Sequence, residues 1–421
     1  MSEKTLGVHS EVGPLRRVLL HRPDLSLRRL TPANRHDLLF DDVLWVDKAR
    51  DDHDEFRAKL EGRGIEVLLL EELLTDVLNI PEGRDWLMTS RITEADYGVF
   101  ADRLRNHLDQ LDSPALARTL IGGLTKEELE LDTRGLYAAT LPTSGFVLPP
   151  LPNHLFTRDT SCWIYNGVTV NPMGTAARWR ETANLQAIYT FHPEFRDLDF
   201  PVWLGGEDEP SHESASLEGG DVLVIGNGTV LVGLSIRTTA QAVEVLARTL
   251  FRAGAAERVI AVEIPKRRAM MHLDTVMTMV DRDAFSIFPD FSGSARSWTI
   301  TPGDAGDGRD AGSGPADEND GRLVVTENPD FLRAVASALD LDELRLFTTG
   351  GDSYEVRREQ WDDGNNVLAL APGVVVGYDR TVDTNQKLRN AGIEVIEIPG
   401  SELGRGRGGA RCMSCPIVRE A

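Results

Sequence analysis

The chain is short of cysteine, of positive charge and of long apolar runs, and each shortage excludes a class of protein. Among 421 residues there are three cysteines, Cys162, Cys412 and Cys415. An odd and sparse set of this kind is typical of a reducing compartment without structural disulfides. The net charge of −22 argues against a nucleic-acid partner, because phosphate would be repelled over most of the surface.

No stretch approaches the roughly 18 consecutive apolar residues of a membrane helix. The first residues, "MSEKTLGVHSEVG", are polar and lack the apolar segment of a secretory signal. We therefore expect a cytoplasmic protein that binds neither membrane nor nucleic acid. Apolar residues make up 41% of the chain, enough for a sizeable core, and the acidic balance suits a small cationic ligand.

Four segments predict β-hairpins. "SCWIYNGVTVNP" and "DVLVIGNGTVLVGLS" each carry Asn-Gly at the turn, the strongest short-range hairpin signal. "TVMTMVDRDAFSIFP" is expected to turn near Asp281 to Asp283, and "NVLALAPGVVVGY" at Pro372-Gly373. "PLRRVLLHRP", near residue 14, is interpreted as a fifth and less regular member of the set.

A helix followed by a buried strand recurs after these hairpins. Residues 56–73, "FRAKLEGRGIEVLLLEEL", and 385–403, "NQKLRNAGIEVIEIPGSEL", share G-I-E-V after a glycine stop. Five ββαβ units result, and such units must pack on one another to bury their faces. Because the first and last are most alike, we expect a closed ring, a five-bladed α/β propeller over residues 1–73 and 148–421. A linear solenoid is the alternative.

Two segments depart from the repeat. Residues 74–147 have caps and apolar residues spaced three or four apart, which predicts an inserted helical domain. Residues 303–321, "GDAGDGRDAGSGPADENDG", predict a flexible acidic loop, since little in them could pack. The acids in that loop lack the spacing of an EF-hand calcium site.

Polar residues gather where the predicted hairpins begin. Asp159, Glu218 and Asp274 each stand at or just before a first strand, and His272 lies two residues before Asp274, on the same face of an extended segment. Each alone has an ordinary explanation: an acid often caps a turn, and a lone histidine is more often structural. Their repeated placement favours a shared site on the axis of the ring.

Two arginines repeat the pattern. Arg178 lies 19 residues after Asp159, and Arg237 lies 19 residues after Glu218. An arginine after a strand is usually a surface charge, but equal offsets indicate equivalent positions in successive units.

The stretch "GRGRGGARCMSCPI", residues 404–417, allows several interpretations. A zinc site needs about four ligands, and no second cysteine pair exists. A redox pair normally opens a helix, whereas Pro416 follows Cys415 directly. An RNA-binding tail conflicts with the net charge. We favour a glycine-rich loop that carries one cysteine as a nucleophile.

The acids and arginines together suggest a ligand. Paired carboxylates in an enclosed site bind a planar guanidinium by charge-assisted hydrogen bonds, and arginines bind a carboxylate. A molecule with both groups is arginine.

These motifs resemble those of the arginine deiminases, within the guanidine-modifying (pentein) superfamily. The matching stretches are "LTPANRHDLLFDDVLWV", "NHLFTRDT", "MGTAARWRET", "SLEGGDVL", "GLSIRT", "MHLDTVMT" and "GSELGRGRGGARCMSCPI". They span almost the whole chain. The resemblance implies a five-bladed propeller with an inserted helical bundle. It implies hydrolysis of L-arginine to L-citrulline and ammonia, through an S-alkylthiouronium intermediate on a cysteine, in arginine degradation.

The resemblance also implies roles for residues. Cys412 would be the nucleophile with Cys415 a bystander, and His272 the general acid and base. Glu218 would orient His272, and Asp159 and Asp274 would hold the guanidinium. The remaining substrate-binding positions it implies are Arg178 and Arg237 for the α-carboxylate, Asn153 and Phe156 in the pocket, and Arg407 on a mobile loop. Arg411 is given no role.

The same resemblance implies no metal or organic cofactor, and suggests a homo-oligomer. Three other reactions on this scaffold stay open: amidinotransfer, agmatine deimination and methylarginine hydrolysis. Agmatine has no carboxylate for Arg178 and Arg237 to bind, which disfavours it. A non-catalytic arginine-binding protein is the alternative from a different class.

Overall fold

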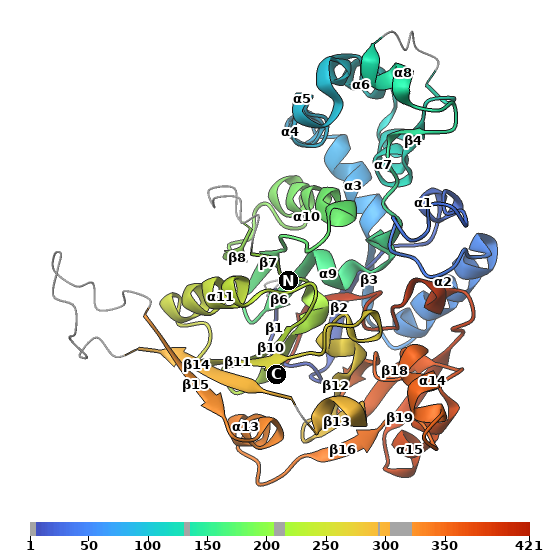
Figure 1. Ribbon diagram of the computed structural model, residues 1–421. Helices are drawn as coiled ribbons and strands as arrows, with labels where there is room; N and C mark the ends of the chain where they lie inside the picture. The colour runs from blue at the N-terminus through green and yellow to red at the C-terminus, as the bar shows by residue number, and fades with distance from the viewer. Residues whose placement is uncertain (1–5, 130–134, 206–214, 294, 304–321) are drawn as a thin grey trace, which may run out of the picture.

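The computed structural model describes residues 6–129, 135–205, 215–293, 295–303 and 322–421 (Figure 1). The acidic loop predicted over 303–321 lies outside the described residues, apart from Gly303. The chain forms several small sheets covered by helices, which confirms the mixed α/β class.

Five sheets repeat one pattern of strand pairing. In each, two antiparallel strands are followed by a helix and then by a third strand that pairs in parallel with the second. The four predicted hairpins are all present. In chain order the strands are β6 (Ser161–Ile164), β7 (Gly167–Val170) and β8 (Val202–Leu204); β9 (Val222–Gly226), β10 (Thr229–Leu234) and β11 (Arg258–Glu263); β12 (Met277–Asp281), β13 (Ala284–Ile287) and β16 (Arg345–Thr348); β17 (Leu368–Ala371), β18 (Val374–Tyr378) and β19 (Glu394–Ile398).

The fifth hairpin, predicted within "PLRRVLLHRP", was wrong in detail. This segment is a single strand, β2 (Leu15–Leu20), and its antiparallel partner is β20 (Cys415–Arg419) from the other end of the chain. β3 (Glu66–Leu69) adds in parallel to β2, and β1 (Gly7–Val8) adds to β20. The sequence signal was misleading because the partner strand lies almost 400 residues away.

The helices of the units are α2 (Val46–Glu61), α10 (Trp179–Phe191), α11 (Ala240–Arg252), α13 (Phe331–Ala338) and α15 (Val382–Asn390). Both α2 and α15 end shortly before the glycines that the sequence predicts as stops. In α11, the Thr239 side chain caps the first turn, and the left-handed Gly254 (φ 64°) ends the helix. Its buried face, which includes Val243, Leu246 and Leu250, packs against β8, β11 and β14 (Ser297–Pro302).

The sequence did not predict one hairpin. β14 and β15 (Leu323–Asn328) pair with each other and extend the sheet of β9, β10 and β11. They flank the acidic loop. The polar composition of that loop does not predict a hairpin turn between the two strands.

Neighbouring sheets touch in a cyclic order. β20 contacts β6, β12 contacts β17, and β17 contacts β2. The 3-10 turn η4 (Gly219–Asp221), which leads into β9, contacts both α9 (Thr157–Thr160) and η6 (Leu273–Thr275). The segments that lead into the first strands therefore meet one another near the middle of the molecule.

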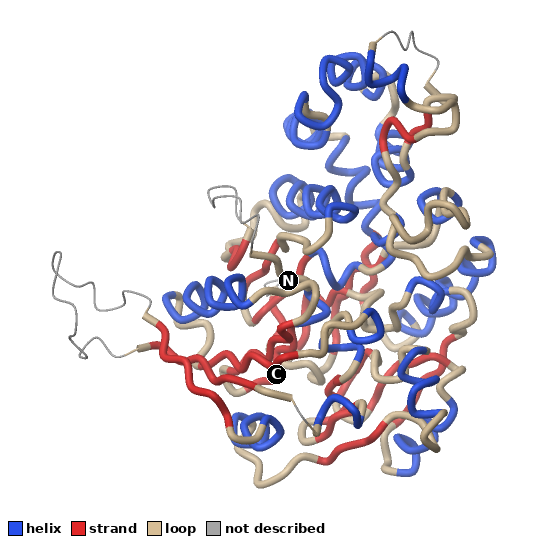
Figure 2. The backbone as a smooth tube through the Cα atoms, viewed as in Figure 1, coloured by secondary structure: helices blue, strands red, loops and turns tan. Residues whose placement is uncertain are grey.

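A helical lobe projects from this arrangement (Figure 2). α3 (Leu70–Leu78) leads into it and, with α4 (Pro81–Arg91), packs on α10 of the second unit. The rest comprises α5 (Glu94–Tyr97), α6 (Ala101–Leu108), α7 (Ser113–Gly122), α8 (Leu136–Thr140), and the short strands β4 (Leu124–Thr125) and β5 (Phe146–Leu148). A separate inserted domain at 74–147 stays a prediction. Among the described helices, none combines the length and apolarity needed to cross a membrane.

Three histidines are buried where the first unit meets η2 (Pro152–Leu155). The rings of His21 and His154 lie 5.8 Å apart, and His53 on α2 is fully buried. Neither ring nitrogen of His53 has a hydrogen-bond partner among the described residues. Burial lowers the pKa of His53 to about 3 and that of His21 to about 4, so both rings are neutral in the folded protein.

This burial predicts a loss of stability in acid. The unfolded chain takes up a proton on His53 near pH 6.5, but the folded chain does so only near pH 3, so stability falls as the pH drops between those values. His53→Leu should therefore gain about 2 kcal/mol over the parent protein between pH 7.5 and pH 5. Urea denaturation at both pH values measures this difference, with the exposed His36→Leu as the control. An equal difference at the two pH values would contradict it.

Candidate active site

The site forms where the first strands of the five sheets begin. Cys412 precedes β20, Asp159 precedes β6, Glu218 precedes β9, Asp274 precedes β12 and Asn366 precedes β17. Each unit thus delivers a polar side chain from the same place in its fold. In the sequence, the three acids were recognised because each stands just before the first strand of a hairpin. Asn366 stands in the same place, before β17, but was not predicted as a site residue.

Eight of the ten predicted site residues line one small cavity. Its walls also include Leu39, Met271 and Gly406, and the predicted residues are Asn153, Phe156, Asp159, Arg178, Arg237, His272, Arg407 and Cys412. The other two touch the walls: Glu218 bonds to His272, and Asp274 contacts Cys412. The free space is about 20 Å³, room for about one water molecule.

The Cys412 thiol sits between a donor and an acceptor. Asn366 Nδ2 donates to Cys412 Sγ over 3.1 Å, and Sγ lies 3.5 Å from Asp274 Oδ2. The side chain is 3% exposed. Burial raises the pKa of Cys412 well above its usual value, the carboxylates of Asp274 and Asp159 raise it further, and Arg411 opposes them. The resting cysteine is therefore a neutral thiol at neutral pH.

The glycines before Cys412 are required by close packing. A Cβ on Gly408 would lie 2.4 Å from the Phe156 ring, and one on Gly409 would lie 2.5 Å from the Asn366 carbonyl oxygen. Any larger residue would push the loop off the cavity. These glycines therefore allow the loop to lie close against the protein's own residues Phe156 and Asn366.

His272 faces two carboxylates. Its Nε2 lies 2.7 Å from Glu218 Oε2, and its Nδ1 lies 3.7 Å from Asp159 Oδ1. Burial alone lowers the pKa of His272, but Asp159 and Glu218 outweigh it and raise the pKa to about 9. The ring is therefore an imidazolium at neutral pH. Asp221 supports this segment, because its Oδ1 accepts a hydrogen bond from Leu273 N over 2.8 Å.

Arg178 is engaged on every side. Its Nη1 donates to Asp159 Oδ2 over 2.6 Å, its Nε and Nη2 donate to Glu181, and Nη2 also donates to the carbonyl oxygens of Asn153 and Phe156. A substrate carboxylate would have to displace one of these partners. The geometry favours Arg178 as the support of Asp159, while its predicted role in binding substrate stays a prediction.

Arg237 is less committed. Its Nη1 donates to Thr175 Oγ1 over 3.1 Å and to Glu218 Oε1 over 3.4 Å. Its Nε is buried without a hydrogen-bond partner among the described residues. This guanidinium can therefore accept a new anionic partner more readily than Arg178 can.

Arg411 holds two distant parts of the chain. Its Nη1 donates to Asp274 Oδ2 over 2.8 Å, while Nε and Nη2 donate to the two carboxylate oxygens of Glu11. All three side chains are buried. No local feature of the sequence indicates Glu11, whose partner is 400 residues away.

Two residues of the cavity wall, Leu39 and Arg407, have strained backbone conformations, and we call the wall around them the roof. Leu39 (φ 65°) and Arg407 (φ 63°) both lie in the left-handed region, which is uncommon for non-glycine residues. The Arg407 guanidinium stacks 3.6 Å from the Trp361 ring centroid. Burial lowers the pKa of Arg407, and the buried Asp363 carboxylate opposes this shift. Trp361 and Asp363 were missed by sequence reasoning.

The two remaining predicted pocket residues pack beneath this roof. Asn153 Nδ2 donates to the Leu38 carbonyl oxygen over 2.8 Å. The Phe156 ring stacks on Phe40 with centroids 6.1 Å apart. Both tie the segment around Leu39 to the site.

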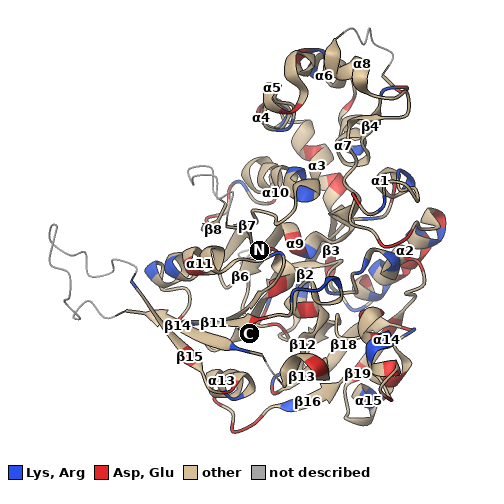
Figure 3. Cartoon of the chain, in the orientation of Figure 1, with Lys and Arg blue, Asp and Glu red and all other residues tan. Residues whose placement is uncertain are grey.

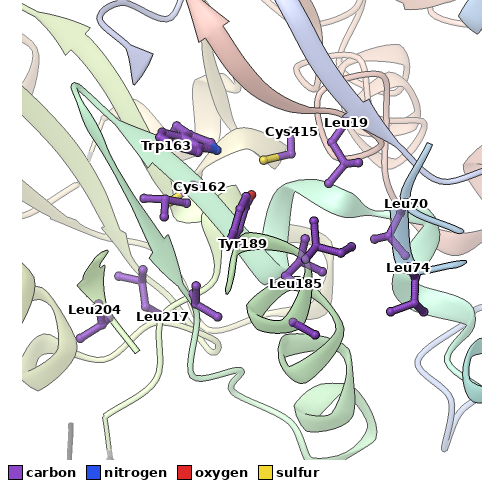
Figure 4. Packing of buried hydrophobic residues seen from close by; sticks show 14 of the residues in the cluster. Leu19, Leu70, Leu74, Cys162, Trp163, Leu185, Tyr189, Leu204, Leu217 and Cys415 are labelled. Carbon is purple, nitrogen blue, oxygen red and sulfur yellow. The ribbon is translucent and has the colours of Figure 1, made fainter. Parts of the chain in front are cut away.

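Cys415 lies in the apolar core and away from the cavity (Figure 4). Its Sγ donates to the Ser161 carbonyl oxygen over 3.3 Å, near Tyr189 and Trp163. Cys162 is fully buried as well, and burial raises its pKa to about 12. Burial also raises the pKa of Cys415, although the nearby Arg158 opposes this shift.

One set of residues has ligand atoms close enough for a metal ion. Asp159, Glu218 and His272 each offer an atom within 4.8 Å of the others. However, guanidinium groups of Arg178 and Arg237 already face the two carboxylates. Cationic partners at this point make the set a poor fit for a further resident cation. The predicted absence of a metal or cofactor stays a prediction.

The chain resembles solved guanidine-modifying enzymes in fold. It matches SxtG, an amidinotransferase from Microseira wollei in saxitoxin biosynthesis, with 14% identity, a TM-score of 0.52, and coverage of 99% of this chain and 98% of that one. It matches dimethylarginine dimethylaminohydrolase from Pseudomonas aeruginosa, complexed with citrulline, with 13% identity, a TM-score of 0.52, and coverage of 96% and 100%. The N-terminal domain of ArgZ, covalently bound to a reaction intermediate, matches at 11% identity with a TM-score of 0.52, and coverage of 96% and 98%.

These likenesses, at 11–14% identity, show that the chain shares the fold of these enzymes. A sequence-family model described as arginine deiminase matches residues 36–419, nearly the whole chain. The chain therefore belongs to the arginine deiminase family, as the motifs in the sequence indicated.

The two arginines of the site should differ in what their loss costs. Arg178→Met leaves Asp159 and Glu181 buried without their cation and should reduce the free energy of unfolding by about 3–5 kcal/mol. Arg237→Met should cost about 1 kcal/mol, because Glu218 keeps its bonds to His272 and Gly174 N. Chemical denaturation of both variants measures this contrast. Equal losses would show that Arg178 is not the structural partner of the acids.

Proposed function

We propose that this protein is an arginine deiminase that hydrolyses L-arginine to L-citrulline and ammonia. The observation that carries the proposal is that a buried thiol, an imidazolium and two carboxylates lie on or beside one enclosed cavity. Membership of the arginine deiminase family supports the choice of substrate.

Asp274 provides the clearest argument for a cationic ligand. Its Oδ2 binds Arg411, but its buried Oδ1 has no hydrogen-bond partner among the described residues. A buried carboxylate oxygen without a donor is costly, and a planar guanidinium would satisfy it. Asp159, across the cavity, would take the other guanidinium nitrogens. The two acids would then fix the guanidinium plane beside Cys412.

Binding of that cation would also activate the nucleophile. In the resting site the negative charge on Asp274 and Asp159 favours the neutral thiol of Cys412. A bound guanidinium would compensate both charges. This lowers the pKa of the thiol, whose proton then passes to solvent, so the thiolate forms when substrate is present.

The protonation states of Cys412 and His272 then suit two successive half-reactions. The Cys412 sulfur forms a bond to the guanidinium carbon, and His272 donates its proton to the departing nitrogen, which leaves as ammonia. A planar S-alkylthiouronium stays on the sulfur. Neutral His272 next accepts a proton from water, whose oxygen bonds to the same carbon. The carbon–sulfur bond breaks and the hydroxyl proton of the adduct is released to solvent, which leaves citrulline and the thiolate. Glu218 keeps the imidazole oriented throughout.

Substrate entry requires the site to open. The free space of about 20 Å³ is far below the roughly 300–1,000 Å³ of ordinary ligand pockets. The strained roof residues Leu39 and Arg407 are the segments best placed to move. The glycines around Arg407 allow this movement, and the stack on Trp361 holds the closed position.

We propose that the five sheets are the blades of one closed propeller. The cyclic contacts between neighbouring sheets and the pairing of β2 with β20 from opposite chain ends support closure. The helical lobe would be an inserted domain over residues 74–147. A homo-oligomer and a cytoplasmic location remain part of this proposal. Acidic and basic residues are both spread over the elements of the described part of the chain (Figure 3).

A second candidate is another guanidine modification, either amidinotransfer or methylarginine hydrolysis. Its support is the likeness in fold to an amidinotransferase and to dimethylarginine dimethylaminohydrolase. Purified protein with arginine should release citrulline and ammonia in equal amounts. Ornithine as the product from arginine, or dimethylamine from dimethylarginine with arginine left intact, would favour the second candidate.

Replacing the nucleophile should abolish turnover but keep the binding site. Cys412→Ala should lower citrulline formation by about 10⁴-fold or more, because no other group can form the covalent intermediate. Arginine should still bind, as measured by calorimetry, since Asp159 and Asp274 are intact. Cys415→Ala is the matched control and should retain activity. Activity in Cys412→Ala near that of the parent protein would remove the sulfur from the mechanism.

The turnover rate should fall in alkali. His272 must be an imidazolium to donate its proton, and its pKa is raised to about 9. At saturating arginine, kcat should therefore decline with an apparent pKa no higher than about 9, since the bound cation lowers it further. Glu218→Gln removes a neighbouring negative charge and should move this decline to lower pH. A decline at unchanged pH in that variant would contradict the assignment of the limb to His272.

A further inference from the structure

The Asn366 side chain forms hydrogen bonds with the segment that carries Cys412. It is 1% exposed and lies just before β17, at the place where the other four units supply Cys412, Asp159, Glu218 and Asp274. Its Oδ1 accepts hydrogen bonds from Cys412 N over 3.0 Å and Gly409 N over 3.1 Å. Its Nδ2 donates to Cys412 Sγ over 3.1 Å and to the Asp274 carbonyl oxygen over 3.2 Å.

These partners fix which way the carboxamide points. Two backbone N–H groups face one end of the amide, so that end must be the oxygen. A flipped amide would set its NH₂ against both donors and leave the Asp274 carbonyl oxygen facing an acceptor. The NH₂ group is therefore held against the sulfur by bonds that do not involve the sulfur.

Asn366 is also the one neutral donor to this sulfur in the described part of the chain. Both hydrogens on its Nδ2 are used, one by the sulfur and one by a carbonyl oxygen. The carboxylates around Cys412 oppose a negative charge there, and an N–H bond to an anion is stronger than one to a neutral group.

We propose that Asn366 is a catalytic residue of this site. Its oxygen fixes the backbone on which Cys412 is mounted, and its NH₂ group stabilises the sulfur anion that attacks the substrate and is regenerated when product leaves. This inference rests on the proposed role of Cys412 as the nucleophile. Because Asn366 belongs to the sheet of β17 and not to the glycine loop, it can hold Cys412 in place while the roof around Arg407 opens.

Two variants separate the two ends of the amide. Asn366→Asp keeps an oxygen for Cys412 N and Gly409 N, and it replaces the donor with a negative charge. Asn366→Ala removes both ends and adds no charge. Asn365→Ala is the matched control, because Asn365 is equally buried but bonds to Ser286, Thr349 and the Thr275 carbonyl oxygen.

The measurement is the pH dependence of alkylation of Cys412 by iodoacetamide, located by peptide mass mapping, in the full chain without substrate. The apparent pKa of the thiol should rise by about one unit in Asn366→Ala, the size expected for a lost hydrogen bond to an anion, and by more in Asn366→Asp. It should be unchanged in Asn365→Ala. A purely structural role would leave the apparent pKa of Asn366→Ala at the parent value, because this variant adds no charge.

An unchanged thiol pKa in both Asn366 variants, or an equal rise in the control, would overturn the inference. Thermal unfolding shows whether each variant is folded, and Asn366→Leu, which removes the donor without adding charge, decides the question if Asn366→Ala does not fold. The alkylation titration needs no turnover. It therefore tests Asn366 even if arginine is not the substrate, and a failure of the proposed function is seen separately, as absence of citrulline with the parent protein.

Discussion

The buried carboxylates of the candidate site are stable only beside cations, and the arrangement of the site follows from this requirement. Asp159 faces Arg178, Glu218 faces His272 and Arg237, and Asp274 faces Arg411. All of these side chains are buried, where an isolated charge would cost several kcal/mol. The repeated fold makes the compensation possible, because each unit delivers its polar residue to the same point.

One carboxylate oxygen is left out of this compensation. Asp274 Oδ1 has no donor among the described residues, while its Oδ2 is shared by Arg411 and the Cys412 thiol. Under the proposed function, a bound guanidinium would satisfy this oxygen and offset the charge that keeps Cys412 protonated.

The sequence predicted the parts of the structure that are local or repeated. Asn-Gly turns, glycine stops and equal offsets between acids and arginines are short-range signals, and the 19-residue spacing corresponds to direct ion pairs at Asp159 and Glu218. The missed parts depend on distant partners. β20 was not recognised as the partner of β2, and Glu11 was not recognised as the partner of Arg411, because nothing near either residue indicates the other. Asn366 was not predicted because the site was inferred mainly from charged residues, and an amide side chain carries no charge.

The proposed mechanism requires a bond between the Cys412 sulfur and the guanidinium carbon of an arginine held in this cavity. The most direct test is to mix the protein with isotopically labelled arginine, quench in acid within the first turnovers, and measure the mass of the peptide that contains Cys412. The account predicts an adduct on this peptide with the mass of arginine less ammonia, present in the parent protein and absent from Cys412→Ala. Labelled citrulline formed without any such adduct, or an adduct on Cys162 or Cys415 instead, would contradict it.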